Sequence, residues 1–141
     1  MDIRPLTGTL SVSPQIAPSD LATLAARGFR TVINNRPDGE EPGQPTSSAM
    51  AAAAAAAGLA YRHIPVVPGQ LQEAQVDGFA EALAALPGPT LAYCRTGTRS
   101  ATLWALQAAR RLPADRVLAS ARAAGYDLSG LAPRLASTPR D

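Results

Sequence analysis

Short β-rich runs alternate with helical segments along this chain, and this alternation limits the possible fold more than any other feature of the sequence. The expected strands cover residues 9–12, 29–34, 61–67 and 90–94, and the expected helices cover residues 18–27, 46–57, 71–86, 100–112 and 113–124. Strands that alternate with helices predict a mostly parallel sheet covered on both faces. We therefore expect an α/β three-layer sandwich in which about four strands are flanked by about five helices.

The length of the chain bears on the number of domains. A chain of 141 residues fits one compact domain and leaves no room for a second sizeable core. We expect a single domain over residues 1–141, with its core at about residues 2–135 and a flexible tail at residues 137–141.

Composition excludes several kinds of chemistry. All 13 basic residues are arginine, so Schiff-base chemistry and a Walker-type phosphate loop, which need lysine, are excluded. The single cysteine cannot form an internal disulfide, and one cysteine with one histidine cannot build a structural zinc site. We expect no metal and no cofactor.

Charge and hydropathy patterning indicate where such a chain works. The net charge is +2 and no basic run exceeds two residues, which gives nucleic-acid binding little support. No apolar run reaches the roughly 18 residues of a membrane span, and the first residues lack the order of a secretory signal. We expect a cytoplasmic chain that binds neither nucleic acid nor membranes.

The segment around Cys94 carries the strongest chemical signal. It lies between the expected strand at 90–94 and the expected helix at 100–112, where α/β folds place their active sites. Backbone N–H groups of a tight loop and the following helix N-terminus form a site for anions and favour a thiolate. A buried structural cysteine is the alternative interpretation. The short loop and its arginines favour a nucleophile.

Each residue of this segment has an expected role. Cys94 is the expected nucleophile, and the guanidinium of Arg99 can bind two oxygens of a tetrahedral anion. Ser100 can donate a hydrogen bond to the sulfur. The remaining candidates for substrate binding are Arg95, Thr96, Gly97 and Thr98 from the same loop and Arg36 from another. Arg36 could alternatively anchor its own loop.

The sequence Tyr-Cys-Arg-Thr-Gly-Thr-Arg-Ser at residues 93–100 resembles the active-site loops of Cys-based phosphatases and rhodanese-type sulfurtransferases. The flanking stretches at residues 10–16, 32–40 and 125–128 resemble the beta-lactamase hydrolase-like protein phosphatase-like family. The resemblance covers about residues 2–135 and implies a fold similar to that of dual-specificity phosphatases. Because family members also occur joined to persulfide-oxidising metallo-hydrolase domains, it implies such a hydrolase as a partner. With one histidine, this chain cannot itself hold the metal cluster of such a domain.

The length of the loop favours sulfur transfer over phosphate hydrolysis. Arg99 follows Cys94 in a Cys-x4-Arg spacing. Cys phosphatases resemble one another in a Cys-x5-Arg loop, which is one residue longer. The shorter loop fits a sulfane sulfur better, by resemblance to rhodaneses. Our leading hypothesis from the sequence is a sulfurtransferase that passes sulfur from thiosulfate or a persulfide, through a Cys94 persulfide, to a thiol acceptor.

The alternative enzyme is a phosphatase that forms a phosphocysteine on a phosphorylated substrate. That reaction needs an acid to protonate the leaving alkoxide, and Asp38 is the candidate. Asp38 can equally be a turn residue before Gly39. A third possibility is a non-catalytic module that binds anions or phosphopeptides, although binding alone would not require the nucleophile.

Overall fold

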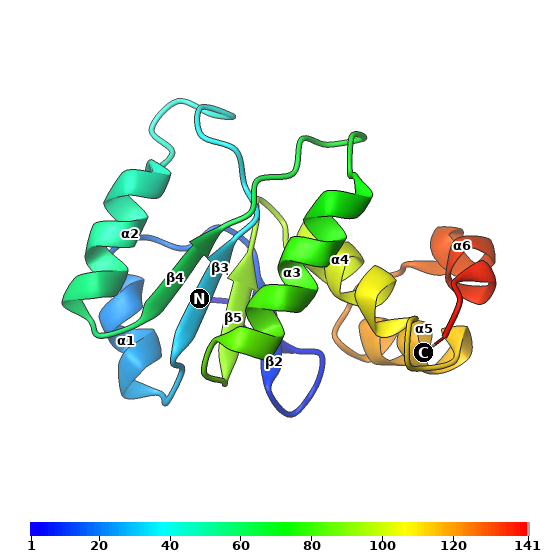
Figure 1. Cartoon of the computed structure of the whole chain (residues 1–141). Coiled ribbons are helices and arrows are strands. Elements are labelled where there is room, and N and C mark those ends of the chain that lie inside the picture. The colour runs from blue at the N-terminus through cyan, green and yellow to red at the C-terminus, as the bar shows by residue number, and fades with distance from the viewer. Residues whose placement is uncertain (141) are drawn as a thin grey trace.

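A single mixed sheet forms the centre of the computed structural model, which describes residues 1–140 (Figure 1). Its five strands lie in the order β1-β2-β5-β3-β4. Strands β2, β5, β3 and β4 are parallel, whereas β1 is antiparallel to β2. The strands are β1 (Arg4–Pro5), β2 (Leu10–Ser13), β3 (Thr31–Asn34), β4 (Ala60–His63) and β5 (Thr90–Tyr93). The expectation of a mostly parallel sheet is confirmed.

Helices cover both faces of this sheet, as the three-layer prediction required (Figure 1). Helices α1 and α2 lie on one face, and α3 and α4 lie on the other, with α5 and α6 packed outside α4. The helices are α1 (Asp20–Ala26), α2 (Ser47–Ala56), α3 (Glu73–Ala85), α4 (Thr98–Ala108), α5 (Ala114–Ala123) and α6 (Ala132–Ser137), the last preceded by a short 3-10 turn (Ser129–Leu131).

The two faces of the sheet have separate hydrophobic cores. Neighbouring residues of β3 and β5 point to opposite faces, as the strand pleat requires: Val32 packs toward α1 and α2, and Ile33 packs toward α3 and α4. Both residues are fully buried. The α1–α2 side also contains Leu21, Leu24, Met50, Leu91 and Tyr93, and the α3–α4 side contains Val76, Phe79, Ala92, Leu103 and Trp104. Burial on both faces explains why these strands are apolar throughout.

Several predicted boundaries were wrong. Helix α4 begins at Thr98, two residues earlier than predicted, because Gly97 supplies the backbone conformation that starts it. It ends at Ala108, before the predicted residue 112. Strand β4 ends at His63 instead of residue 67, since Pro65 has no N–H to continue the ladder. Strand β1 and helix α6 were not predicted.

The register of the sheet brings three loops to one edge. The last residues of β2 and β3, Ser13 and Asn34, both lie opposite Tyr93 at the end of β5. The chain segments that follow these strands therefore meet where ligands bind in open α/β sheets. Within residues 1–140, every helix is too short or too polar to cross a lipid bilayer.

Candidate active site

Cys94 directly follows β5 and begins the loop to α4 (residues 94–99, here the Cys94 loop). Its side chain is buried, and the backbone N–H of Gly97 donates a hydrogen bond to its Sγ at 3.1 Å. A donor aimed at the sulfur stabilises a negative charge there. The predicted strand-to-helix position of Cys94 and the predicted backbone donor are thus both present.

The conformation of the Cys94 loop requires glycine at position 97. Gly97 has φ +93°, a left-handed value that side chains rarely adopt. A Cβ atom there would also collide with the hydroxyl oxygen of Tyr126 and lie 2.9 Å from its Cζ. The Tyr126 hydroxyl donates to the Thr96 carbonyl oxygen at 3.1 Å. Tyr126 therefore packs against the loop in the space that a side chain at position 97 would occupy.

Arg99 reaches back from the first turn of α4 to the loop after β3. Its Nη1 donates to Glu40 Oε2 at 2.8 Å and to the Val66 carbonyl oxygen at 2.8 Å, and its Nη2 donates to Glu40 Oε1 at 2.9 Å. A guanidinium has five N–H donors. The Nε–H and one Nη2–H, which share an edge, have no hydrogen-bond partner among residues 1–140 and could bind two anion oxygens.

Glu40 connects Arg99 to Arg36. The Nε of Arg36 donates to Glu40 Oε1 at 2.7 Å, and Arg36 is almost completely buried. The hydrogen bonds from Arg99, and then those from Arg36, hold the pKa of the Glu40 carboxyl below its usual range despite the opposing effect of burial. Glu40 is therefore an ionised anchor that fixes the direction of both guanidinium groups.

Glu41 extends this arrangement to Arg95. Its Oε1 accepts from Arg36 Nη2 at 2.7 Å and lies 2.8 Å from Arg95 Nε. The result is an alternating series of charges along the mouth of the Cys94 loop, here called the charge network: Arg95, Glu41, Arg36, Glu40 and Arg99. Three cations against two anions leave one net positive charge beside Cys94.

Arg36 was predicted either to bind the anion or to anchor its own loop. The structure shows contacts of Arg36 that anchor this loop. Its Nη1 donates to Gln15 Oε1 at 3.1 Å, in the segment after β2. His63 Nε2 lies 2.9 Å from the Arg36 carbonyl oxygen. Arg36 thus ties the loops after β2 and β3 together.

Ser100 has a different partner from the predicted one. Its hydroxyl donates to Asn35 Oδ1 at 2.8 Å, not to the sulfur of Cys94. Asn35 is fully buried and also donates to the Ile64 carbonyl oxygen at 3.0 Å. The pair joins the start of α4 to the loop after β3.

Asp38 lies on the expected edge of the sheet but makes a structural contact. Its side chain is exposed, and its Oδ1 accepts a hydrogen bond from the backbone N–H of Ser47, the first residue of α2, at 2.7 Å. A carboxylate at a helix N-terminus is stabilising. Asp38 and Gly39 lie in a turn, as the turn interpretation predicts, and the acid role of Asp38 stays a prediction.

The remaining loop candidates, Thr96 and Thr98, are exposed and bond to each other through their hydroxyl groups at 3.0 Å. Four residues that contribute to the arrangement of the site were not predicted from the sequence: Gln15, Asn35, Glu40 and Glu41. Gln15, Asn35 and Glu40 lie within the segments that carried the family resemblance, and Glu41 directly follows one of them. Residues 1–140 bring together no group of three His, Cys, Asp or Glu side chains that could hold a metal ion.

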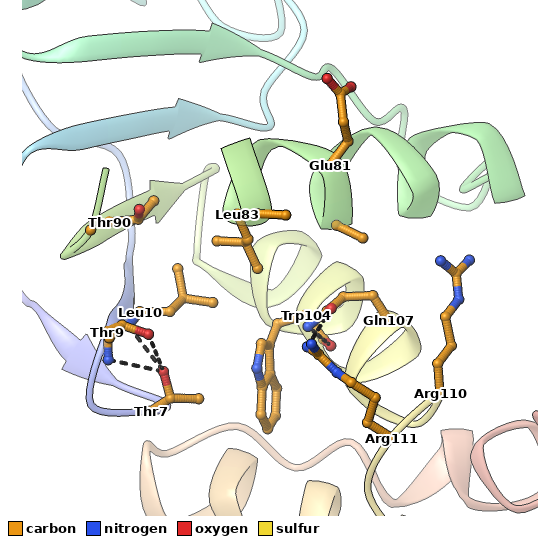
Figure 2. A pocket seen from close by; sticks show the side chains of 13 residues that line it. Thr7, Thr9, Leu10, Glu81, Leu83, Thr90, Trp104, Gln107, Arg110 and Arg111 are labelled. Carbon is orange, nitrogen blue, oxygen red and sulfur yellow. Dashed lines mark hydrogen bonds between the residues drawn. The ribbon is translucent and has the colours of Figure 1, made fainter. Parts of the chain in front are cut away.

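One cavity of the protein lies away from Cys94. It has a volume of about 730 Å³ and is lined by the start of β5 at Thr90, by Leu10 of β2, by Trp104 of α4 and by Arg110 just after α4. Figure 2 shows these side chains around the opening. Thr90 lies four residues before Cys94, about 13 Å away along an extended strand. This cavity is therefore separate from the site.

Residues 2–111 match the model of the family described as beta-lactamase hydrolase-like protein, phosphatase-like domain. The chain belongs to this family. A beta-lactamase hydrolase-like protein from Xylella fastidiosa is 41% identical over 130 residues, which is 91% of this chain and 30% of the relative. One from Agrobacterium fabrum is 45% identical over 98 residues, 70% of this chain and 22% of the relative. The chain thus spans less than a third of the length of these curated members of the family.

Solved structures share the fold over nearly the whole length. A crystal structure from Neisseria meningitidis, described as a candidate phosphatase, is 36% identical, covers 96% of both chains and superposes with a TM-score of 0.85. The core catalytic domain of the PP-IP phosphatase Siw14 from S. cerevisiae is 14% identical, with a TM-score of 0.72 over 100% of this chain and 86% of that chain. The latter likeness concerns the fold alone. The fold is that of a Cys-phosphatase, as the family resemblance implied.

Proposed function

We propose that this chain is a Cys-dependent phosphatase. The observation that carries the proposal is the Cys94 loop, in which a backbone donor faces the sulfur and one guanidinium edge of Arg99 has no hydrogen-bond partner among residues 1–140. The 36% identical structure described as a candidate phosphatase supports the same reaction. These comparisons support hydrolysis better than the sulfur transfer that the loop length favoured.

The reaction would take two displacements at phosphorus. The Cys94 thiolate attacks the phosphorus of a phosphomonoester, an S–P bond forms, and the P–O bond to the alcohol breaks. Water then attacks the phosphocysteine, the S–P bond breaks, and inorganic phosphate and the thiolate are released. Arg99 and the loop N–H groups would neutralise the charge on the phosphoryl oxygens in both steps.

The leaving alkoxide must take up a proton in the first step. Glu40 is a poor donor because its two arginine partners keep it ionised. Asp38 is exposed and one of its oxygens already accepts from Ser47. We propose Asp38 as the acid through its other oxygen, and we expect a preference for substrates whose leaving groups need little protonation.

Sulfur transfer is the second candidate, and the Cys-x4-Arg spacing supports it. In that reaction Cys94 attacks the outer sulfur of thiosulfate, the S–S bond breaks and sulfite leaves with the electron pair. A thiol acceptor then takes the sulfur from the persulfide. No acid is needed, because sulfite is a good leaving group.

Intact-mass measurement of trapped protein separates these possibilities. The protein is mixed with an aryl phosphate or with thiosulfate and quenched in acid, and its intact mass is measured by mass spectrometry. Cys94→Ser is the control. We expect a phosphoryl adduct with the aryl phosphate together with release of inorganic phosphate, both absent in the variant. A gain of one sulfur without a phosphoryl adduct would replace the phosphatase with the sulfurtransferase. An anion that binds without forming either adduct would indicate a non-catalytic module.

A further inference from the structure

A second cavity opens directly beside the Cys94 loop. It has a volume of about 450 Å³ and lies among the loop after β2, the loop after β3 and the first residue past Cys94. Its polar lining consists of Gln15, Arg36, Glu41, Gln44 and Arg95, and we call it the Arg36–Arg95 pocket. Because Arg95 follows Cys94 in the chain, their Cα atoms are only about 3.8 Å apart.

The carboxylate of Glu41 occupies the anion-binding position between the two arginines of the pocket. Arg36 Nη2 and Arg95 Nε both contact one oxygen of Glu41, Oε1, at 2.7 and 2.8 Å. The side chain of Arg36 is 3% exposed, that of Glu41 is 45% exposed and that of Arg95 is 64% exposed. The buried guanidinium is thus fixed in place, while the carboxylate that neutralises it can turn out into solvent.

A further polar group in the pocket lacks a partner. Gln44 Oε1 is buried and accepts no hydrogen bond among residues 1–140, although its Nε2 donates to the Pro37 carbonyl oxygen at 2.9 Å. A buried acceptor without a donor is rare in folded proteins. A ligand with an anionic group for the arginines would also satisfy Gln44 Oε1 if it carries an O–H and the Gln44 side chain turns toward the pocket. A phosphate monoester carries these groups when it holds one proton.

We propose that the Arg36–Arg95 pocket binds a second phosphoryl group, so that the preferred substrates are small molecules with two phosphates. This inference rests on the proposed phosphatase, whose reacting phosphate occupies the Cys94 loop. The second phosphate displaces Glu41 and takes its place between Arg36 and Arg95. It carries more charge than the carboxylate and offers more oxygens to Arg36 Nη2 and to the guanidinium group of Arg95, a group that can bind oxyanions in a bidentate manner.

The kinetic test compares glucose 1,6-bisphosphate with glucose 6-phosphate by release of inorganic phosphate. For the wild-type protein we expect kcat/KM to be about tenfold or more higher for the bisphosphate, since hydrogen bonds between charged groups have that size. Arg95→Ala should remove most of this preference. Glu41→Gln should increase it, because a neutral amide competes less well for the arginines. Arg122→Ala removes one exposed arginine of α5, a helix that contributes no residue to the pocket, and should leave the preference unchanged.

A binding test keeps the result independent of turnover. Inorganic diphosphate and orthophosphate are titrated calorimetrically into Cys94→Ser and into the Cys94→Ser, Arg95→Ala double variant, after circular dichroism has shown that both are folded. We expect diphosphate to bind more tightly than orthophosphate, and only the diphosphate affinity to fall by about tenfold in the double variant.

The outcomes separate the two proposals. Hydrolysis of both sugar phosphates with equal kcat/KM, or an Arg95→Ala variant that keeps the preference, would overturn the pocket and leave the phosphatase intact. If neither sugar phosphate is hydrolysed, the phosphatase fails for this class and the calorimetry decides. A diphosphate affinity that depends on Arg95 would then support the pocket alone, and one that does not would overturn it.

Discussion

Glu40 binds both Nη atoms of Arg99 with its two carboxylate oxygens, at 2.8 and 2.9 Å, although the two residues lie 59 positions apart. The contact joins the loop after β3 to the first turn of α4. It occupies one edge of the guanidinium and directs the other. The orientation of Arg99, which we propose as the main anion-binding side chain, is therefore set by a different loop from the one that carries the proposed nucleophile.

Glu40→Gln should lower phosphatase activity by about 10- to 100-fold, because a neutral amide cannot hold both Nη groups of Arg99. The measurement is kcat and KM on an aryl phosphate. Glu81→Gln is the matched control, since Glu81 is exposed on α3. Equal activity of Glu40→Gln and the wild-type protein would show that Arg99 keeps its direction without Glu40.

Glu40 should also make the free energy of unfolding depend on pH in the acid range. The pKa of Glu40 is lowered in the folded state by hydrogen bonds from Arg99 and Arg36. The ionised carboxylate therefore stabilises the fold fully above its ordinary value of 4.5, and this contribution is lost as the pH falls through the lower folded value. Urea unfolding between about pH 3 and pH 7 should show this loss, and Glu40→Gln should make the profile flatter. An identical slope in the two proteins would contradict the assignment.

Arg99→Lys should weaken anion binding clearly while it retains the charge. Arg99 binds Glu40 and the Val66 carbonyl oxygen with three N–H groups, which leaves two N–H groups for a ligand. Lysine has only three donors, all on one nitrogen. Inhibition by orthophosphate measures the effect. Arg111→Lys controls for a general effect of the substitution, because Arg111 lies just after α4 and lines the separate cavity around Thr90 and Trp104. Unchanged inhibition constants would move the role to Arg36 or Arg95.

Asp38→Asn tests whether Asp38 is the acid that protonates the leaving group. With Asp38 as proton donor, turnover of alkyl phosphates should fall by about 10²-fold, whereas aryl phosphates with acidic leaving groups should lose much less. The loss of the contact to Ser47 will lower stability in either case, so activity is compared at a temperature well below unfolding, with circular dichroism as the check. An equal, small loss for both classes of substrate would leave Asp38 with its structural role only.

Gly97→Ala should both distort the Cys94 loop and destabilise the protein by at least about 1 kcal/mol, because φ is positive there and Tyr126 fills the space of a side chain. Gly78→Ala is the matched control. Gly78 lies within α3, and a Cβ there meets nothing within 4 Å, so that variant should be more stable by about 0.5–1 kcal/mol. Thermal unfolding of both variants, with activity, provides the comparison. Full activity in Gly97→Ala would contradict the loop geometry.

The parts of the fold that repeat a local pattern could be predicted from the sequence. The strands β3 and β5 appear as continuous apolar runs, and α3 appears as a helical stripe through Val76 and Phe79, so each signal lies within one short segment. The two-residue strand β1 is too short to show any period, and α6 is a helix of six residues that begins with a Pro in its first turn. Such elements form through contacts with the rest of the fold and not through local preference.

The candidate site divides in the same way. Cys94 and Arg99 belong to one short segment, so their spacing revealed them. Glu40 and Glu41 lie in a loop rich in proline and glycine that has no periodic pattern, and their partners come from distant segments. Ser100 was assigned to the sulfur because Asn35, its actual partner, is 65 residues away. Pairings across loops depend on side-chain directions that a single sequence does not encode locally.

The short antiparallel strand β1 also has a consequence for how this protein behaves at high concentration. A sheet edge exposes unpaired N–H and C=O groups that can recruit another chain and start aggregation. Here β1 covers β2, and its outer residue Pro5 has no N–H to offer, while the neighbouring Asp2–Arg4 ion pair adds charge. At the opposite edge, β4 carries the exposed Arg62. Both margins are thereby protected against the addition of a foreign strand.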